Sequence, residues 1–125
     1  MILSDRILGL IDAMETQRLQ EEKEWNLSVA RMAQAAAVIV DSAIREQGII
    51  PEHVDYALCS DGSIDLEFHF ADLELDINID NAGDDLIQTV SQKNDTKYYQ
   101  DTYKPEQVYN KIIEFLRALN DGNSN

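Results

Sequence analysis

Two stretches of this chain place polar residues at every second position, which is the spacing of side chains on one face of a β-strand. Their polar residues are Asp65, Glu67 and His69 in the first stretch, and Glu74, Asp76, Asn78 and Asp80 in the second. Carboxylates on one face can bind a basic protein surface, and together with an imidazole they can bind a divalent cation. A carboxylate pair with separated pKa values can transfer protons. All three kinds of chemistry require the two stretches to lie side by side.

The two stretches are predicted to form a hairpin whose register follows from its apolar residues. Phe70 and Leu73 both belong to the apolar face and only two residues separate them, so a slip of one residue would mismatch the faces. The polar pairs that result are His69 with Glu74, Glu67 with Asp76, and Asp65 with Asn78. Like charges opposite one another destabilise a sheet by about 0.2–1 kcal/mol per pair. The pattern therefore indicates a role beyond stability.

Four interpretations of this face stay open. The carboxylates can simply keep an apolar hairpin soluble and prevent sheet aggregation. They can bind a basic partner, in the sharpest form by imitating a nucleic-acid backbone, because alternate strand residues lie about 6.8 Å apart and DNA phosphates repeat about every 3.4 Å along one strand. A third interpretation is a Mn²⁺, Mg²⁺ or Zn²⁺ site made of His69, Glu74, Glu67 and Asp76, although side chains on a flat sheet diverge into water. The fourth is acid–base catalysis by Glu67 and Asp76, which requires a burial that no predicted element supplies.

The acidic residues belong to a wider charge asymmetry. Residues 46–92 contain no Lys or Arg and hold 12 of the 24 Asp and Glu residues, and the 125-residue chain has a formal net charge of −14. Direct binding to nucleic acid or to an anionic membrane is therefore not expected. The complementary partner is a basic protein surface, including the nucleic-acid-binding face of another protein.

The elements that position the face are predicted from hydrophobic periodicity. Residues 4–47 are predicted to form one helix or a pair of helices, and Asn26 and Ser28 are the places for a break because both side chains can cap a helix. Gly48 is the expected helix end. The alanine-rich run at 33–37 indicates either tight core packing or a dimer seam, so a homo-oligomer assembled through residues 29–44 is an alternative to a monomeric binder.

After residue 51 the hydrophobic period changes to two. Residues 54–91 are predicted to form a four-stranded antiparallel meander with one buried and one wet face, with turns at Asp61-Gly62 and at 81–84. Residues 92–102 are predicted to be a polar loop, residues 105–120 a C-terminal helix packed on one sheet face, and residues 121–125 a frayed tail. The expected fold is a single α+β domain spanning residues 1–125.

Few residues elsewhere indicate chemistry. Cys59 is the only cysteine, which excludes an internal disulfide and suits a reducing compartment, and we interpret it as a small buried hydrophobe. His53 is interpreted as a surface loop residue and Trp25 as a core anchor. Tyr98, Tyr99 and Tyr103 indicate an interface patch or a cover for a sheet edge.

The chain lacks the usual signatures of catalysis and of membrane insertion. It has no nucleophile with a base, no phosphate-binding glycine loop and no Cys/His metal spacing, so we expect no enzymatic activity, no cofactor and no metal. It also lacks a basic leader and an apolar run close to the roughly 20 residues that span a bilayer. These features predict a cytoplasmic protein.

The hairpin carries a motif that resembles one in a group of small uncharacterised bacterial proteins. Their pattern, Gly-x-Ile-x-Leu-Glu-Trp-His followed by Leu-Glu-Leu-x-Ile, is matched by residues 62–69 and 73–77, with Phe68 at the aromatic position. Such proteins are often accessory to toxin–antitoxin or defence loci, so the resemblance implies an interaction role. In charge and size the chain is also similar to phage inhibitors that imitate DNA.

We therefore expect a non-catalytic acidic interaction module, an inhibitor of the antitoxin or anti-defence type. Its partner-binding residues are expected to be Asp65, Glu67, His69, Glu74, Asp76 and Asp80.

Overall fold

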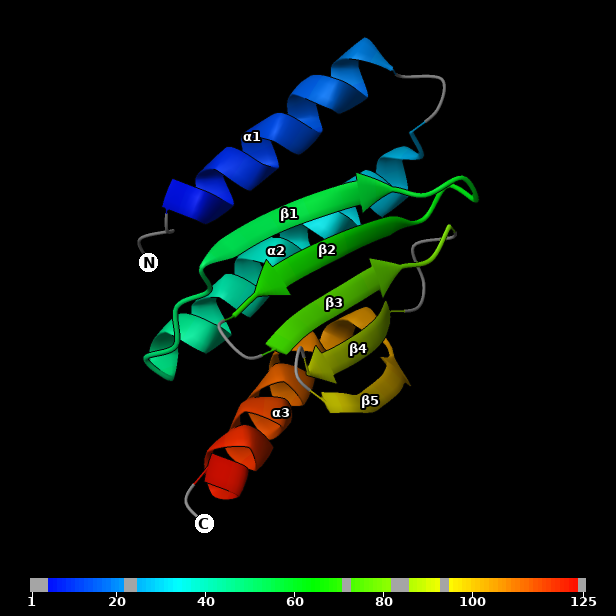
Figure 1. The fold of residues 1–125 in the computed structure, drawn as a ribbon. Helices are drawn as coiled ribbons and strands as arrows, with labels where there is room; N and C mark the ends of the chain where they lie inside the picture. The colour runs from blue at the N-terminus through cyan, green and yellow to red at the C-terminus, as the bar shows by residue number, and fades with distance from the viewer. Residues whose placement is uncertain (1–4, 22–24, 71–72, 82–85, 93–94, 124–125) are drawn as a thin grey trace.

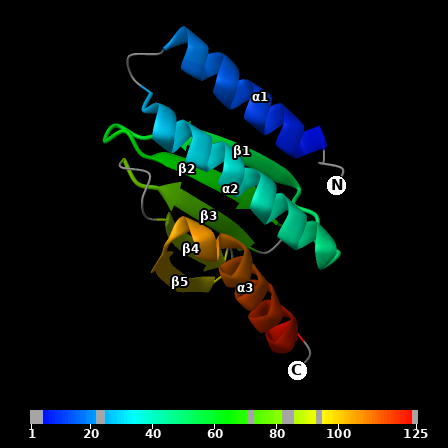
Figure 2. The same cartoon turned by 180° about the vertical axis from the view of Figure 1, so that it is seen from behind.

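The computed structural model describes residues 5–21, 25–70, 73–81, 86–92 and 95–123. In chain order the elements are α1 (Asp5–Gln20), α2 (Leu27–Glu46), β1 (His53–Leu58), β2 (Ile64–His69), β3 (Leu73–Ile79), β4 (Leu86–Gln92), β5 (Asp95–Tyr103), the 3-10 helix η1 (Pro105–Gln107) and α3 (Val108–Asn123). The strands form one antiparallel sheet in the order β1-β2-β3-β4-β5, with α2 and α3 on one face of it (Figures 1 and 2). The predicted α+β class is confirmed.

The N-terminal region forms two helices, and the break lies at Asn26 as predicted. The Asn26 side chain accepts hydrogen bonds from the backbone N–H groups of Ser28 (2.9 Å) and Val29 (3.4 Å). These bonds satisfy two donors that the first turn of a helix leaves without partners. A capping side chain therefore starts α2 independently of α1.

Interactions within a few residues also end α2. Gly48 adopts a φ of 74°, and its N–H donates to the carbonyl of Arg45 while that of Ile49 donates to the carbonyl of Ile44. This pair of bonds is a Schellman motif, which favours glycine because the left-handed conformation is strained for other residues. The predicted helix end at Gly48 is confirmed.

The central helix α2 contacts α1, the sheet and α3. Ala33, Ala36 and Ala37 have no exposed surface, so they serve the close packing of this core. By length and apolar composition α2 is also the one helix, among the described residues, that could cross a membrane. Half of that apolar stretch is buried within this fold. The stretch is not the uninterrupted apolar run that the sequence was expected to lack, because Arg31 and Asp41 interrupt it.

The apolar face of the sheet closes the core against α2 and α3. The side chains of β2 and β3 that point to it are each at most 1% exposed and are Ile64, Leu66, Phe68, Leu75, Ile77 and Ile79. On the helical side, Ile112 and Leu116 of α3 are buried to the same degree. Alternate residues of each strand must then lie on the opposite, polar face, because successive side chains of a strand point to opposite sides.

Helix α1 lies beside β1, which is one edge of the sheet (Figure 1). Trp25 is 7% exposed and packs edge-to-face against Tyr56, with ring centroids 6.2 Å apart. The Tyr56 hydroxyl donates to Oε1 of Gln17 at 2.5 Å. The prediction that Trp25 anchors the core is confirmed, and Tyr56 joins β1 to the covering helix.

Three element boundaries were predicted wrongly. Residues 95–103 form a fifth strand paired with β4 and not a polar loop, β1 begins at His53, and α3 continues to Asn123 through the expected tail. The tyrosines and threonines of β5 have a preference for strands, but this preference is weak. Pairing with β4 is what stabilises residues 95–103 as a strand. Gly122 does not end α3 earlier, because it lies in the last turn, where the backbone carbonyls have no partner within the helix and can bond to water.

Some predictions concern parts of the chain outside the described residues. These are most of the turn at 81–84, the last two residues of the predicted tail, and the side chains of Tyr98 and Tyr99. Tyr103 is described and is 4% exposed, so it belongs to the core. The Asp61-Gly62 turn is confirmed, since Gly62 has a φ of 89° and Oδ1 of Asp61 accepts from the N–H of Ser63 at 2.9 Å.

Candidate acidic site on the polar face of the sheet

The polar face of β1, β2 and β3 carries side chains in rows that run across the strands. The register between β2 and β3 is the predicted one, and β1 extends each row by one residue. The three rows are His53–His69–Glu74, Asp55–Glu67–Asp76 and Ala57–Asp65–Asn78. We call the residues of these rows the acidic face. Its middle row places three carboxylates in line on three neighbouring strands.

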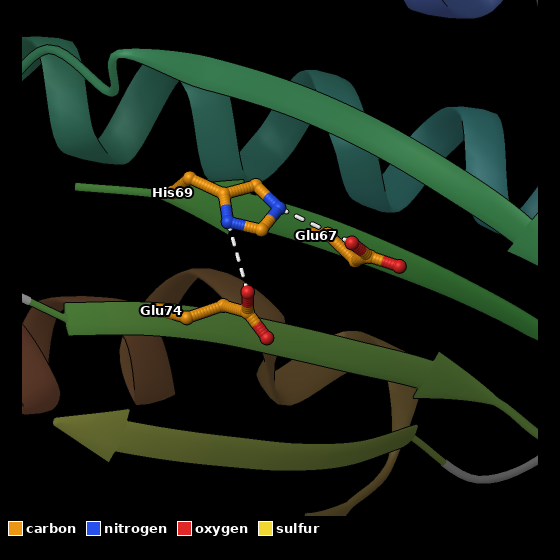
Figure 3. A group of neighbouring side chains, drawn as sticks. All are labelled: Glu67, His69 and Glu74. Atoms are coloured by element: carbon orange, nitrogen blue, oxygen red, sulfur yellow. Dashed lines mark hydrogen bonds and ion pairs between the residues drawn. The ribbon is translucent and has the colours of Figure 1, made fainter. Parts of the chain in front are cut away.

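His69 lies between two carboxylates of the acidic face (Figure 3). Its Nδ1 atom is 2.8 Å from Oε1 of Glu74, and its Nε2 atom is 3.1 Å from Oε1 of Glu67. Both contacts can be hydrogen bonds to carboxylates only when both ring nitrogens carry a proton. The ring therefore bridges a carboxylate of its own strand and a carboxylate of the neighbouring strand.

The cluster formed by Glu67, His69, Glu74 and Asp76 is only partly open to water. The side chains of His69, Glu74 and Glu67 are 24%, 29% and 31% exposed. Long side chains from two paired strands shield one another, because cross-strand neighbours lie only about 4.5–5.5 Å apart. The expectation that the whole row of carboxylates is open to water was wrong.

Asp76 shows the consequence of this shielding. Its Oδ1 atom is buried and has no hydrogen-bond partner. Burial raises the pKa of Asp76 from 3.8 to about 7, and a hydrogen bond with Glu74 and repulsion by the Glu74 and Glu67 carboxylates act in the same direction. A carboxyl group with such a pKa is partly protonated at neutral pH, so the charge of the middle row depends on pH.

The other two predicted site residues lie outside this cluster. Asp65 accepts hydrogen bonds from Nδ2 of Asn78 at 2.5 Å and from the Cys59 thiol at 3.4 Å, which occupy its carboxylate within the third row. Asp80 directly follows the last residue of β3. The structure thus brings Glu67, His69, Glu74 and Asp76 together and places Asp65 and Asp80 at the periphery.

Sequence reasoning missed the contribution of β1. Asp55 lies opposite Glu67, and His53 lies opposite His69 with ring centroids 5.6 Å apart, so His53 is a strand residue and not a loop residue. A weak signal was present, because His53 and Asp55 alternate with apolar Val54 and Tyr56. The preceding Pro51 and Glu52 obscured that alternation.

Three members of the cluster could hold a metal ion. One ligand atom each from Glu67, His69 and Glu74 lie within 4.8 Å of one another. In a tetrahedral zinc site each ligand atom lies about 2.0–2.2 Å from the ion. The imidazole would therefore have to turn one nitrogen without a proton toward the ion, and the carboxylates that now contact the ring directly would have to move to admit it. Two carboxylates and an imidazole suit Mn²⁺ or Zn²⁺.

Cys59 has the surroundings of a structural residue. It is half-buried at the end of β1, and burial raises the pKa of its thiol, with the nearby Asp65 carboxylate contributing. A raised pKa disfavours the reactive thiolate. Cys59 is thus unreactive as expected, but it is less buried than the sequence predicted.

Comparisons of the chain with protein-family models, with curated proteins and with solved structures found no match. A fold alone does not define a function, which depends on the chemistry of the site that the fold carries.

Proposed function

We propose that this protein is a non-catalytic interaction module that docks its acidic face on a basic surface of a partner protein. The observation that carries the proposal is the row formed by Asp55, Glu67 and Asp76, which lie directly opposite one another across three strands. Residues 53–79 contain no Lys or Arg to separate these charges. A sheet selected for stability alone would alternate signs along such a row.

A basic partner would relieve the two costs that the acidic face carries in the free protein. A cation over the middle row offsets the repulsion between neighbouring carboxylates. A donor that reaches Oδ1 of Asp76 supplies a hydrogen bond that this buried atom otherwise lacks. Arginine fits both needs better than lysine, because its planar guanidinium donates several hydrogen bonds at once to carboxylates.

The sequence also suggested what kind of partner the acidic face would bind and what the binding would do. The partner surface would be one that otherwise contacts nucleic acid, which is rich in arginine and lysine. The protein would act in the cytoplasm as an inhibitor of the antitoxin or anti-defence type. Support for this part comes from the hairpin motif and the net charge of −14.

A matched pair of variants tests whether the acidic face or the bulk charge binds. The face variant carries Asp55→Asn, Glu67→Gln and Asp76→Asn. The control variant carries Asp12→Asn, Glu106→Gln and Glu114→Gln at exposed positions of α1, η1 and α3. Each set changes the formal net charge from −14 to −11, since three acidic residues are replaced by amides.

The measurement is binding of an arginine-rich peptide at two salt concentrations, followed by affinity capture from the source cell. We expect the face variant to lose at least tenfold in affinity for the peptide and to lose the captured protein, while the control variant retains both. Equal losses in the two variants would show that only the net charge matters and would exclude a specific docking face.

The arrangement of Glu67, His69 and Glu74 favours a second candidate function, the binding of a divalent cation. Calorimetric titration with Mn²⁺ and with Zn²⁺ should then show saturable binding that His69→Ala and Glu74→Gln abolish. His53→Ala is the matched control, because His53 lies on the same face but outside the three-residue group. A flat titration, or equal binding by all variants, would exclude this function.

A further inference from the structure

A groove follows one edge of the sheet. Among the described residues β1 is the last strand at its end of the sheet, and α1 runs alongside it (Figures 1 and 2). The groove between them measures about 260 Å³ and is lined by four residues of α1, among them Gly9 and Leu10, and by the consecutive residues 53–56 of β1. Consecutive strand residues point to opposite faces, so a groove that touches all four must follow the backbone edge.

The backbone of β1 presents hydrogen-bonding groups to this groove. The N–H of Cys59 donates to the carbonyl of Ser63 at 2.9 Å, in continuation of the β1–β2 register. In an antiparallel pair the bonded residues alternate, so the odd-numbered residues of β1 bond to β2. The N–H and C=O groups of Val54 and Tyr56 therefore point away from β2. Another strand can pair with such groups.

The Asp55 side chain takes the place of a further strand at one of these groups. Its Oδ1 atom accepts a hydrogen bond from the N–H of Tyr56 at 2.8 Å. This N–H points away from β2, so the carboxylate stands where a carbonyl of an added strand would lie. The Asp55 side chain is 57% exposed, so it can release this bond and remain in water.

The groove has room for an extended backbone. Gly9 contributes no side chain to it, and a Cβ atom at this position would have no contact within 4 Å outside its own helix. Cavities that enclose a small molecule have volumes of roughly 300–1,000 Å³, and this groove is smaller. An occupant must therefore lie partly outside the groove, as a strand added to a sheet edge does.

The charges beside the groove favour a basic occupant. The charged residues of 5–13 and 52–56 are all exposed and give a local charge of −3, with Asp5, Asp12, Glu52 and Asp55 against Arg6. A second copy of the chain would bring the same acids to this edge and a net charge of −14, so it is repelled. A segment rich in arginine or lysine is attracted.

We propose that an extended basic segment of the partner protein adds to the sheet as a sixth strand, antiparallel to β1 and seated in the groove beside α1. This proposal rests on the docking function and names the part of the partner that docks. A carbonyl of the segment replaces Oδ1 of Asp55 on the N–H of Tyr56. The freed Asp55 carboxylate pairs with an arginine or lysine directly opposite it, which extends the row of Asp55, Glu67 and Asp76 by a positive charge.

Antiparallel pairing determines the pattern of the segment. Its residues opposite Val54 and Tyr56 exchange backbone bonds with β1, and their side chains lie on the face that packs against the helices. Its residues opposite His53 and Asp55 place their side chains on the acidic face. The segment should therefore alternate apolar and basic residues, and the N–H groups of its apolar residues should be the ones bonded to β1.

The first test uses a capped seven-residue peptide of alternating arginine and valine, with arginine at both ends. One version carries N-methyl groups on its three valines, and a matched version carries them on three arginines. We expect valine methylation to raise the dissociation constant roughly tenfold or more, because each methyl group removes a donor to β1, and arginine methylation to have little effect. Calorimetry with the whole protein measures all three peptides. Equal affinities of the two methylated peptides, or no binding of the unmodified one, would overturn strand addition.

The second test fills the groove. Gly9→Leu places a side chain in it at a helix position that leucine favours over glycine. The variant should keep the circular dichroism of the native protein and bind the unmodified peptide roughly tenfold more weakly. Gly9→Ala is the control and should retain the affinity.

The two proposals fail in different ways. A peptide whose binding is lost in the face variant, but is unaffected by Gly9→Leu and by valine methylation, would overturn strand addition and leave the docking function standing. Equal losses in the face variant and in the control variant of the same net charge would overturn the docking function, and strand addition with it.

Discussion

Asp76 lies directly opposite Glu67 on the neighbouring strand, and its Oδ1 atom is buried without a hydrogen-bond partner. Two carboxylates in this arrangement cannot both ionise without a penalty. Burial raises the pKa of Asp76 to about 7, and the nearby Glu74 and Glu67 carboxylates act in the same direction. His69 offsets part of the repulsion, because it contacts both Glu67 and Glu74. The acidic face is therefore a set of coupled charges, and its properties should change with pH, salt and single substitutions.

The first prediction concerns Asp76→Asn and pH. The folded state raises the pKa of Asp76 from 3.8 to about 7, so folding favours the protonated carboxyl. Its stabilising contribution is complete below about pH 4 and is lost as the pH rises through 7. Asparagine stays neutral, so the variant should exceed the native protein in stability at pH 8 by about 1 kcal/mol, a value reduced for partial exposure, and should match it near pH 4.

Urea unfolding at pH 4 and pH 8 measures this difference. Asp55→Asn is the control, because Asp55 is in the same row but its side chain is 57% exposed. It should change the stability by no more than about 0.5 kcal/mol at either pH. A stabilisation by Asp76→Asn that is the same at both pH values would contradict the proposed cause.

The second prediction concerns His69→Ala. The variant removes both imidazole contacts and leaves Glu67 and Glu74 without the ring that bridges them. We expect the free energy of unfolding at pH 6 to fall by about 1–3 kcal/mol, and added salt should recover part of the loss by screening the carboxylates. His53→Ala, at a side chain that is 65% exposed, should cost much less. Equal losses of stability in the two variants would contradict a stabilising role for the contacts of His69 with Glu67 and Glu74.

The third prediction concerns the start of α2. Asn26→Ala removes the acceptor for the N–H groups of Ser28 and Val29 and should lower the free energy of unfolding by about 0.5–2 kcal/mol. Ser28→Ala is the control, because its backbone N–H remains and alanine favours a helix. Thermal unfolding of both variants decides whether Asn26 acts as the cap. A loss confined to Ser28→Ala would contradict this assignment.

The fourth prediction distinguishes core packing from a dimer seam at the alanine-rich run. Ala36 has no exposed surface, so Ala36→Leu should destabilise the monomer by about 1–3 kcal/mol through overpacking. The adjacent Ala35 is exposed, and Ala35→Leu should stay within about 0.5 kcal/mol. If instead only Ala35→Leu altered the protein, and did so by changing its mass in solution, residues 29–44 would be an interface.

Much of the fold was predictable because the deciding interactions are local. The caps at Asn26 and Gly48 act within a few residues, and the hairpin register follows from the short connection between Phe70 and Leu73. The pairing of Glu67 with Asp76 and of His69 with Glu74 followed directly from that register. Four of the six predicted site residues lie in the cluster for this reason.

The missed features depend on how neighbouring strands pair, and not on the residues of one strand alone. β5 is polar in composition, and it becomes a strand because β4 offers a complete edge. The pairing of β1 with β2 was predicted, but the start of β1 at His53 was not, so the place of Asp55 in the middle row was missed. Asp76 also becomes buried only in the folded sheet, where Glu67 of the neighbouring strand lies opposite it.

The sequence by itself determined which side chains share a face, because the alternation of polar and apolar residues allows only one register in a short hairpin. It also determined the sign of that face, because residues 46–92 contain no Lys or Arg. Only the tertiary structure decided how those charges interact. Neighbouring strands set the distances between the carboxylates and remove water from Asp76, and electrostatic energies depend on both distance and solvent exposure.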